Sequence, residues 1–334
     1  MLLEKLCNAF GVSGYEDEVR DIIISEIKNH VDSLKIDKMG NIIAFKKAPG
    51  KTKKKIMLSA HMDEVGFMIK SIEESGFLKF SPVGGIDPRV LIGKRLLVGK
   101  EKLNGVIIFK PVHVQRADYK NVPEMNSLYI DIGAKDKKDA EKMVCVGDYA
   151  VFSTKFEKNG KIIKGKAFDD RLGCYAIIDL LKRKLTNSVY AVFLVQEEVG
   201  TRGAKIATYA IEPDYAIVLE GTSCADMPSE KDEADYPYMG GGVVVTISDR
   251  TLIVGKAFLE TAVKTAEQNK IKYQFKQPMV GGTDAGAIHI TGKGVKAIVF
   301  AVPARYIHST AGFVNIEDLS AMMELAYHLV NNIQ

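Results

Sequence analysis

From Lys161 to the end of the chain, apolar strand-like runs alternate with segments of helical periodicity. Helical periodicity covers residues 171–184, 203–209, 251–269 and 316–330, and the runs YAVFLVQ, YAIVL, GVVVTI and AIVFAV are the strand candidates. Strands that alternate with helices form a parallel sheet with helices on both faces, because each helical crossover returns the chain to the same end of the sheet. The sequence therefore predicts an α/β fold with a mostly parallel sheet flanked by helices.

The first 66 residues fit the same domain. The apolar spacing over 19–31 predicts an amphipathic helix, and the S-x-x-E sequence at 13–16 predicts a capping box at its start. Residues 33–47 predict two short strands, and the apolar run 56–60 predicts a buried strand that ends in charged residues.

The pattern of apolar and polar residues changes between residues 67 and 160. Short alternating runs are separated by turns rich in glycine, proline and lysine, with one short helix expected at 137–142. This pattern predicts an all-β, barrel-like domain inserted into the α/β domain. We therefore expect a catalytic domain made of residues 1–66 plus 161–334, and an inserted β domain made of residues 67–160.

Composition excludes several classes of protein. The 334 residues are 46% hydrophobic and 26% charged, which is the composition of a globular chain. The net charge of +4 is too small to indicate nucleic-acid binding, and no run of about 18 apolar residues predicts a membrane span. Four widely spaced cysteines without a CxxC pair, and an N-terminus without signal-peptide features, lead us to expect a cytoplasmic protein with reduced thiols.

Histidine and acidic residues stand where apolar strands meet loops. Because parallel strands deliver their carboxyl ends to one edge of a sheet, we expect these residues to meet there. They occur in five places, namely His61, Asp63 and Glu64 in AHMDE, Asp169 and Asp170 in AFDDR, Glu197 and Glu198 in VQEEVG, Glu220 in VLEGT, and His308 in RYIHS.

Two histidines and several carboxylates, without a thiolate, are donors that suit Zn²⁺, Co²⁺ or Mn²⁺. Of two adjacent glutamates, one can bind metal while the other accepts a proton from the attacking water. Each residue also has a structural interpretation. His61 can be structural, Glu197 and Glu198 can be surface charges, Asp169 and Asp170 can cap a helix, and Glu220 can pair with a lysine. The pattern by itself leaves both interpretations open.

Other catalytic classes lack their motifs. The glycines at 240–242 and 281–282 are not followed by the GK[ST] of a P-loop, and they do not open the first βαβ unit as a dinucleotide-binding fingerprint does. Neither Ser59 nor Ser309 lies in G-x-S-x-G, which disfavours a serine hydrolase.

Six motifs, AHMDEVGF, KGKAFDDRLG, FLVQEEVGTRGA, VLEGT, GGTDAGAIH and VPARYIHS, occur in this order. Together they resemble the M42 family of co-catalytic metallo-aminopeptidases, and the likeness extends over nearly the whole chain. The resemblance implies a hydrolase that uses two divalent metal ions per subunit to remove the N-terminal residue of peptides. It also implies homo-oligomers, as dimers and in some members dodecamers, built with the help of the inserted domain.

The resemblance also implies roles for individual residues. His61 and Glu220 would bind one metal, Asp169 would bridge both, and Glu198 and His308 would hold the second. Glu197 would be the general base, Asp63 would orient His61, and the Asp169–Asp170 peptide would be cis. Many relatives have aspartate at the position of Glu220, which leaves open whether the longer side chain coordinates in the same way.

Two other classes of function stay open at this point. Some relatives carry an endoglucanase label, so a metal-independent glycoside hydrolase is the alternative enzyme. Glycosidases need two carboxyl groups across the scissile bond and favour aromatic platforms for sugar rings, and this chain has no tryptophan. A non-enzymatic binding protein that keeps the fold is the third class, but residues of the catalytic types stand at all five places.

Overall fold

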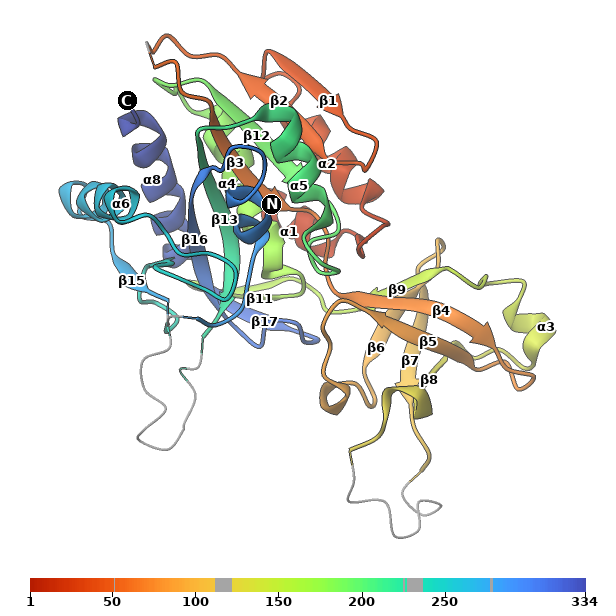
Figure 1. The fold of residues 1–334 in the computed structure, drawn as a ribbon. Helices are drawn as coiled ribbons and strands as arrows, with labels where there is room; N and C mark the ends of the chain where they lie inside the picture. Colours follow the sequence, from red (N-terminus) through yellow and green to blue (C-terminus); the bar gives the residue numbers. More distant parts are fainter. Residues whose placement is uncertain (51, 112–121, 225, 227–236, 277–278) are drawn as a thin grey trace.

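A helix-covered sheet and a smaller β-barrel beside it make up the protein (Figure 1). The computed structural model describes residues 1–50, 52–111, 122–224, 226, 237–276 and 279–334. In the described part, no helix has both the length and the apolar character that a membrane crossing needs.

The central strands of the large sheet are parallel. They lie in the order β12, β3, β13 and β16, with bounds Val189–Leu194, Ile56–His61, Tyr215–Ser223 and Lys296–Arg305. Most edge pairs are antiparallel, and β14 with β15 is a parallel exception, so the sheet as a whole is mixed around the expected parallel centre. The edge strands are β1 (Ser33–Ile36), β2 (Ile42–Lys46), β10 (Glu157–Asn159), β11 (Ile162–Gly165), β14 (Val243–Val245), β15 (Tyr273–Phe275) and β17 (Gly312–Asn315).

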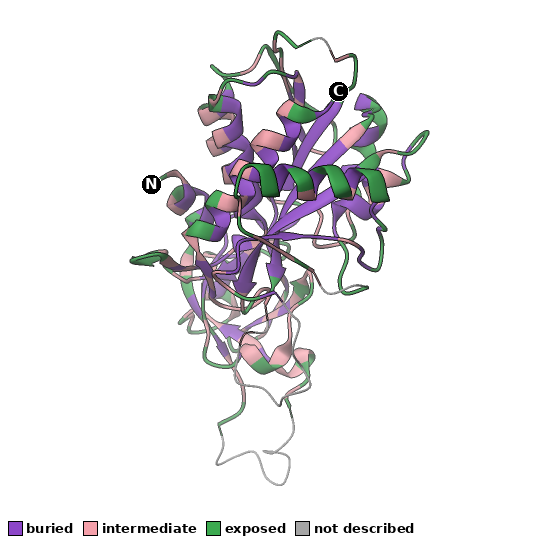
Figure 2. Cartoon of the chain, turned by 90° about the vertical axis from the view of Figure 1, so that its left-hand side faces the viewer, coloured by how far each residue is buried: buried purple, intermediate pink, exposed green. Residues whose placement is uncertain are grey.

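Helices cover both faces of this sheet. Helix α4 packs on β3 and β13 together with α1, α2 and α8, whereas α5 and α7 pack together on the other face (Figure 1). Figure 2 shows buried residues along the central strands and exposed residues on the outer sides of the helices. The helices are α1 (Leu2–Asn8), α2 (Asp17–Ile27), α4 (Phe168–Lys182), α5 (Arg202–Ile211), α6 (Lys256–Gln268), α7 (Asp284–His289) and α8 (Ile316–Asn332).

Coverage on both faces explains the apolar central strands. All six residues of β3 are buried, including His61 at its end. A strand of a sheet that is open to water on one face would alternate polar and apolar residues, whereas a doubly covered strand reads as a continuous apolar run. The histidine that ends this run is therefore buried by its position in the fold.

Two local predictions are wrong, and tertiary contacts explain both. The expected capping box at 13–16 does not form, because Ser13 donates to Asp63 and Glu16 accepts from Gly14 and Gln196. The helix expected from residue 251 begins at Lys256, because the Asp249 carboxylate accepts from the backbone of residues 251 and 252 and closes a turn there.

The inserted segment forms a closed six-stranded barrel. Phe67 is fully buried in its apolar core, and the centroid of its ring lies 5.0 Å from that of Phe80 and 5.4 Å from that of Phe152. We expect the inserted domain to span residues 67–160. Strand β10, which begins at Glu157, pairs with β11 in the large sheet, so the barrel ends before residue 157. The barrel strands are β4 (Gly66–Ile72), β5 (Leu78–Val83), β6 (Arg95–Val98), β7 (Leu103–Ile108), β8 (Tyr129–Asp131) and β9 (Tyr149–Phe152), joined by η1 (Pro88–Val90), η4 (Met125–Ser127) and α3 (Lys137–Ala140).

A buried ion cluster fixes the loop that follows β3. The Glu64 carboxylate lies 2.6 Å from Nζ of Lys166 and 3.2 Å from a guanidinium nitrogen of Arg171, and all three side chains are buried. Arg171 also donates to the carbonyl oxygens of Leu6 and Met62. The cluster therefore ties the N-terminal segment to the residues between His61 and Glu64.

We expect Glu64→Gln to lower the free energy of unfolding by about 3–5 kcal/mol, because it leaves two buried cations without their counter-charge. Urea unfolding followed by circular dichroism measures the change. Glu157→Gln is the control, because the Glu157–Lys164 pair is solvent-exposed and its loss costs at most about 1 kcal/mol. Equal stability of the two variants would contradict this account of the cluster.

Candidate metal centre

The carboxyl ends of the parallel strands collect the histidines and acids that the sequence singles out. His61 ends β3, Glu197 and Glu198 follow β12, Glu220 lies in β13, and His308 follows β16. Asp169, near the start of α4, joins them from the helix layer, and the Asp169–Asp170 peptide is cis, as expected. Because these strands are parallel, all of these groups lie at one edge of the sheet.

Asp169 lies between the two histidines. Its Oδ1 atom is 3.2 Å from Nε2 of His61, and its Oδ2 atom is 3.2 Å from Nε2 of His308. The same nitrogen of His308 is 3.2 Å from Oε1 of Glu198. Two ligands of one tetrahedral zinc ion, each about 2.0–2.2 Å from the metal, lie roughly 3.3–3.5 Å apart. The spacing of the donor atoms therefore matches the spacing of metal ligands.

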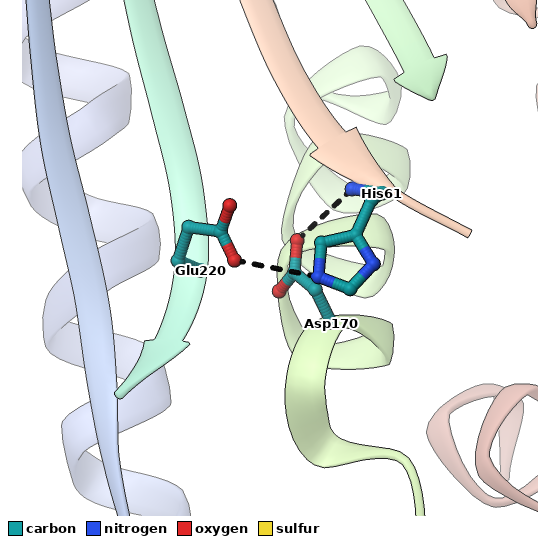
Figure 3. Close-up of side chains that lie close together, drawn as sticks. All are labelled: His61, Asp170 and Glu220. Atoms are coloured by element: carbon teal, nitrogen blue, oxygen red, sulfur yellow. Dashed lines mark hydrogen bonds and ion pairs between the residues drawn. The ribbon is translucent and has the colours of Figure 1, made fainter. Parts of the chain in front are cut away.

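Glu220 approaches His61 from the neighbouring strand (Figure 3). Its Oε2 atom lies 3.6 Å from Nε2 of His61. Asp170 lies in the same close-up, but its two oxygens accept from the backbone N–H groups of His61 and Gly173. Asp170 therefore holds the strand end in place, whereas Glu220 and Asp169 both face Nε2 of His61.

Asp63 connects the histidine to the two glutamates. Its carbonyl oxygen is 3.0 Å from Nδ1 of His61, and because a carbonyl only accepts, Nδ1 carries a proton. In the neutral ring, Nε2 then presents a lone pair toward Asp169 and Glu220. The Asp63 carboxylate accepts from the backbone N–H groups of Glu197 and Glu198 and from the hydroxyl of Ser13.

The pKa values show how strongly these groups interact. Burial acts to lower the pKa of His308, but contacts with Asp169 and Glu198 raise it to about 11. Burial raises the pKa of Glu197 and Glu220 well above the usual range for a glutamate. The cluster therefore disfavours further negative charge until positive charge is added.

The carboxylates lack cationic partners other than the two histidines. Among the described residues, no lysine or arginine forms an ion pair with them. Oε1 of Glu220 is buried and accepts no hydrogen bond from the described chain, and the buried Oε1 of Glu198 has only its 3.2 Å contact with Nε2 of His308. Buried carboxylate oxygens with free lone pairs, next to imidazole nitrogens, are the donor set that a divalent transition metal takes.

Two overlapping donor sets meet a distance criterion for metal binding. One consists of His61, Asp170 and Glu220, and the other of His61, Asp169 and Glu198; in each, the ligand atoms lie within 4.8 Å of one another. The predicted residues are thus brought together. The first set has Asp170 where we expected Asp169, although both Asp170 oxygens accept from backbone N–H groups. The second has His61 where we expected His308, whose Nε2 atom lies 3.2 Å from both Asp169 and Glu198.

The catalytic and metal-binding residues expected from the sequence do not include Asp284. This residue begins α7 and is fully buried, and neither of its carboxylate oxygens has a hydrogen-bond partner among the described residues. Burial raises its pKa to about 7, and its charge adds to the raised pKa of Glu197. Asp284 lies in the motif GGTDAGAIH, but an acidic residue after a threonine is also common at the start of a helix, so the motif alone does not indicate a residue of the site.

Several residues beside the site have left-handed backbone. Ala167, Gln196 and His308 have φ values of 55°, 57° and 56°. Non-glycine residues adopt this region at a cost of about 1–3 kcal/mol, and they do so mainly where surrounding structure forces them. The surrounding contacts therefore hold Asp169, Glu197 and His308 in place at an energetic cost.

Comparison with known proteins places the chain in a family. The sequence model described as M42 glutamyl aminopeptidase matches residues 40–325, and the protein belongs to the M42 family. A protein of Acetivibrio thermocellus that carries an aminopeptidase name is 40% identical over 97% of this chain and 96% of its own. The lysyl aminopeptidase of Pyrococcus furiosus is 31% identical over 100% of this chain and 97% of its own. The glutamyl aminopeptidase of Lactococcus lactis is 32% identical over 92% of this chain and 88% of its own.

Solved structures share the whole fold. An aminopeptidase from the archaeon Desulfurococcus kamchatkensis superposes with a TM-score of 0.95 at 38% identity, covering 99% of this chain and 94% of that one. The TET1 peptidase of Pyrococcus horikoshii, described as assembling into a tetrahedron or a large octahedral shell, has a TM-score of 0.88 at 35% identity (99% of each chain). A Thermotoga maritima protein described as an endoglucanase has a TM-score of 0.83 at 36% identity (98% and 96%).

Proposed function

We propose that the protein is an aminopeptidase that depends on two divalent metal ions, Zn²⁺ or Co²⁺ with Mn²⁺ as a further candidate, and hydrolyses the N-terminal residue of peptides. The observation that carries this proposal is the position of Asp169, whose two oxygens each lie 3.2 Å from a different histidine. A carboxylate in that position can bridge a pair of ions. Membership of the M42 family supports the peptidase reaction.

Each ion would have its own ligands beside the shared Asp169. His61 and Glu220 would hold one ion, and His308 and Glu198 would hold the other. Asp63 would be a positioning residue, because it fixes the Nδ1 proton of His61 and accepts from the backbone of both glutamates. The two metal ions, when bound, would polarise the scissile carbonyl group and lower the pKa of a bound water molecule.

Glu197 would act as the general base. Its backbone is fixed by Asp63, its side chain lines the cavity beside His61 and Asp169, and burial raises the pKa of its carboxyl well above the usual range. A base with a pKa closer to neutrality can accept the proton of the attacking water and then return it to the leaving amine. The adjacent glutamate would stay on the metal.

The inserted β-barrel would support assembly and substrate access. We infer homo-oligomers, namely dimers and possible dodecamers. One similar structure is described as a dodecamer, and the P. horikoshii TET1 peptidase is described as assembling into a tetrahedron or a large octahedral shell. A cytoplasmic location belongs to the same proposal. It is supported by four unpaired cysteines, two of them buried. Neither nucleic acid nor a membrane is part of the proposed activity.

A metal-independent glycoside hydrolase is the alternative, because one similar structure is described as an endoglucanase. A glycosidase would use a pair of carboxyl groups flanking the sugar, one of which donates a proton. At this site the carboxylates face imidazole nitrogens at ligand spacing, which favours the metal-dependent reaction. Activity on cellulose that persists in chelator would support the alternative.

We expect chelation by EDTA or phenanthroline to abolish release of nitroaniline from aminoacyl anilides, and Co²⁺, Zn²⁺ or Mn²⁺ to restore it. Because an ion that binds only the folded state stabilises that state, the melting temperature should also fall in chelator and recover with metal. Full peptidase activity in excess chelator, with no metal detected by mass spectrometry, would refute the metal dependence.

Glu197→Gln should keep its metal and lower kcat by about 10²–10⁴-fold, because the amide cannot accept the proton. Metal content by mass spectrometry and kcat on an aminoacyl anilide are measured on the same sample. Glu260→Gln, on the exposed side of α6, is the control and should match the wild type. Near-normal turnover of Glu197→Gln would reject the base, whereas loss of metal would make Glu197 a ligand.

A further inference from the structure

A cavity of about 190 Å³ opens beside the proposed metal ligands. His61, Asp169, Glu197 and Glu220 are among the residues that line it. The other described residues that line it are mostly small or polar, among them Thr222, Ser223, Gly282 and Thr283, and Ile307 is the one large aliphatic residue in this described set. Such a wall offers little apolar surface for a leucine or phenylalanine side chain.

Lys276 also lines this cavity. It follows strand β15, and its backbone N–H donates to the carbonyl oxygen of Val245, which holds the residue beside the sheet. A Cβ atom placed on Gly281 would lie 3.6 Å from its Nζ atom, so the ammonium group faces the glycine loop that forms the wall.

The ammonium group of Lys276 has no carboxylate partner in the described part of the chain, where each ion pair of a lysine involves another residue. Lys276 is also the only lysine or arginine among the described residues that line the cavity. A half-buried cation that lacks a counter-charge is placed to bind an anion from outside the chain.

We infer that Lys276 binds the side-chain carboxylate of the substrate's N-terminal residue, so that the enzyme prefers peptides beginning with glutamate or aspartate. The inference rests on the proposed aminopeptidase function and names its substrate class. The same ammonium group disfavours lysine or arginine at that position by charge repulsion. Family membership does not decide this preference, because a lysyl and a glutamyl aminopeptidase are similarly distant relatives.

The carboxylates that line the cavity would repel an acidic side chain in the metal-free protein. Two divalent ions at the proposed site would offset that charge, so the ammonium group of Lys276 would then attract an acidic side chain. The acidic preference is therefore expected only of the metal-loaded protein.

Glutamyl and glutaminyl anilides give the sharpest test, because their side chains differ in charge and hardly in size. We expect the wild-type, metal-loaded enzyme to have a higher kcat/KM for the glutamyl anilide, and Lys276→Ala to lower the glutamyl-to-glutaminyl ratio by about 10- to 100-fold. Lys276→Arg should keep part of the preference, and Lys276→Glu should shift it toward the lysyl anilide. Lys264→Ala, an exposed lysine of α6, is the matched control and should leave the ratio unchanged.

Calorimetry provides a readout that does not depend on turnover. Free glutamate should bind the metal-loaded protein more tightly than glutamine, and Lys276→Ala should remove the difference. Metal-dependent cleavage of alanyl and glutaminyl anilides with a glutamyl-to-glutaminyl ratio near one would overturn the role of Lys276 and leave the proposed function intact. Failure to cleave any anilide, combined with tighter glutamate binding that requires Lys276, would overturn the aminopeptidase proposal and leave the anion site standing.

Discussion

Carboxyl groups crowd at the C-terminal edge of the central sheet, and two histidines are the only cationic side chains paired with them in the described chain. The buried carboxylate of Glu64 differs from these groups because it has cationic partners. Lys166 and Arg171 balance its charge, and Arg171 connects it to the N-terminal segment. A buried negative cluster without such balance is costly in a low-dielectric interior. Divalent cations remove that cost, which makes the edge of the sheet a place where metal binding and folding are linked.

The rest of the fold holds these groups in place. Ser13, near the N-terminus, donates to Asp63, and Asp63 in turn accepts from the backbone of Glu197 and Glu198, more than 130 residues further along the chain. Left-handed residues beside Asp169 and Glu197 add backbone constraint. Contacts with the rest of the fold therefore hold the loops that carry the site, and the intrinsic conformational preferences of the loop residues do not. Such support is expected where side chains must be held within about 0.5 Å of a working geometry.

Strand direction alone is enough to predict which of these residues lie close together. His61, Glu198, Glu220 and His308 each stand in or just after a strand of the parallel centre, so the rule that parallel strands share one edge is enough to bring them together. The parallel centre, the barrel and most helices follow in the same way from periodicity. The pairing of the edge strands does not, because it depends on long-range contacts that periodicity does not encode.

The features that the sequence does not predict involve polar side chains whose partners are distant in sequence. Ser13 and Glu16 look like a local capping box, but tertiary contacts to Asp63 and Gln196 take their hydrogen-bonding groups. Asp284 looks like the start of a short helix, and only its position against the cluster raises its pKa to about 7. Local motifs predict local bonds, and a functional site is where tertiary contacts most often override them.

Anomalous diffraction from crystals of the protein loaded with Zn²⁺ or Co²⁺ tests the central claim most directly. The account predicts two metal peaks in each subunit, one beside His61 and Glu220 and one beside His308 and Glu198, with Asp169 bound to both. A single peak, or two peaks that do not share Asp169, would contradict it.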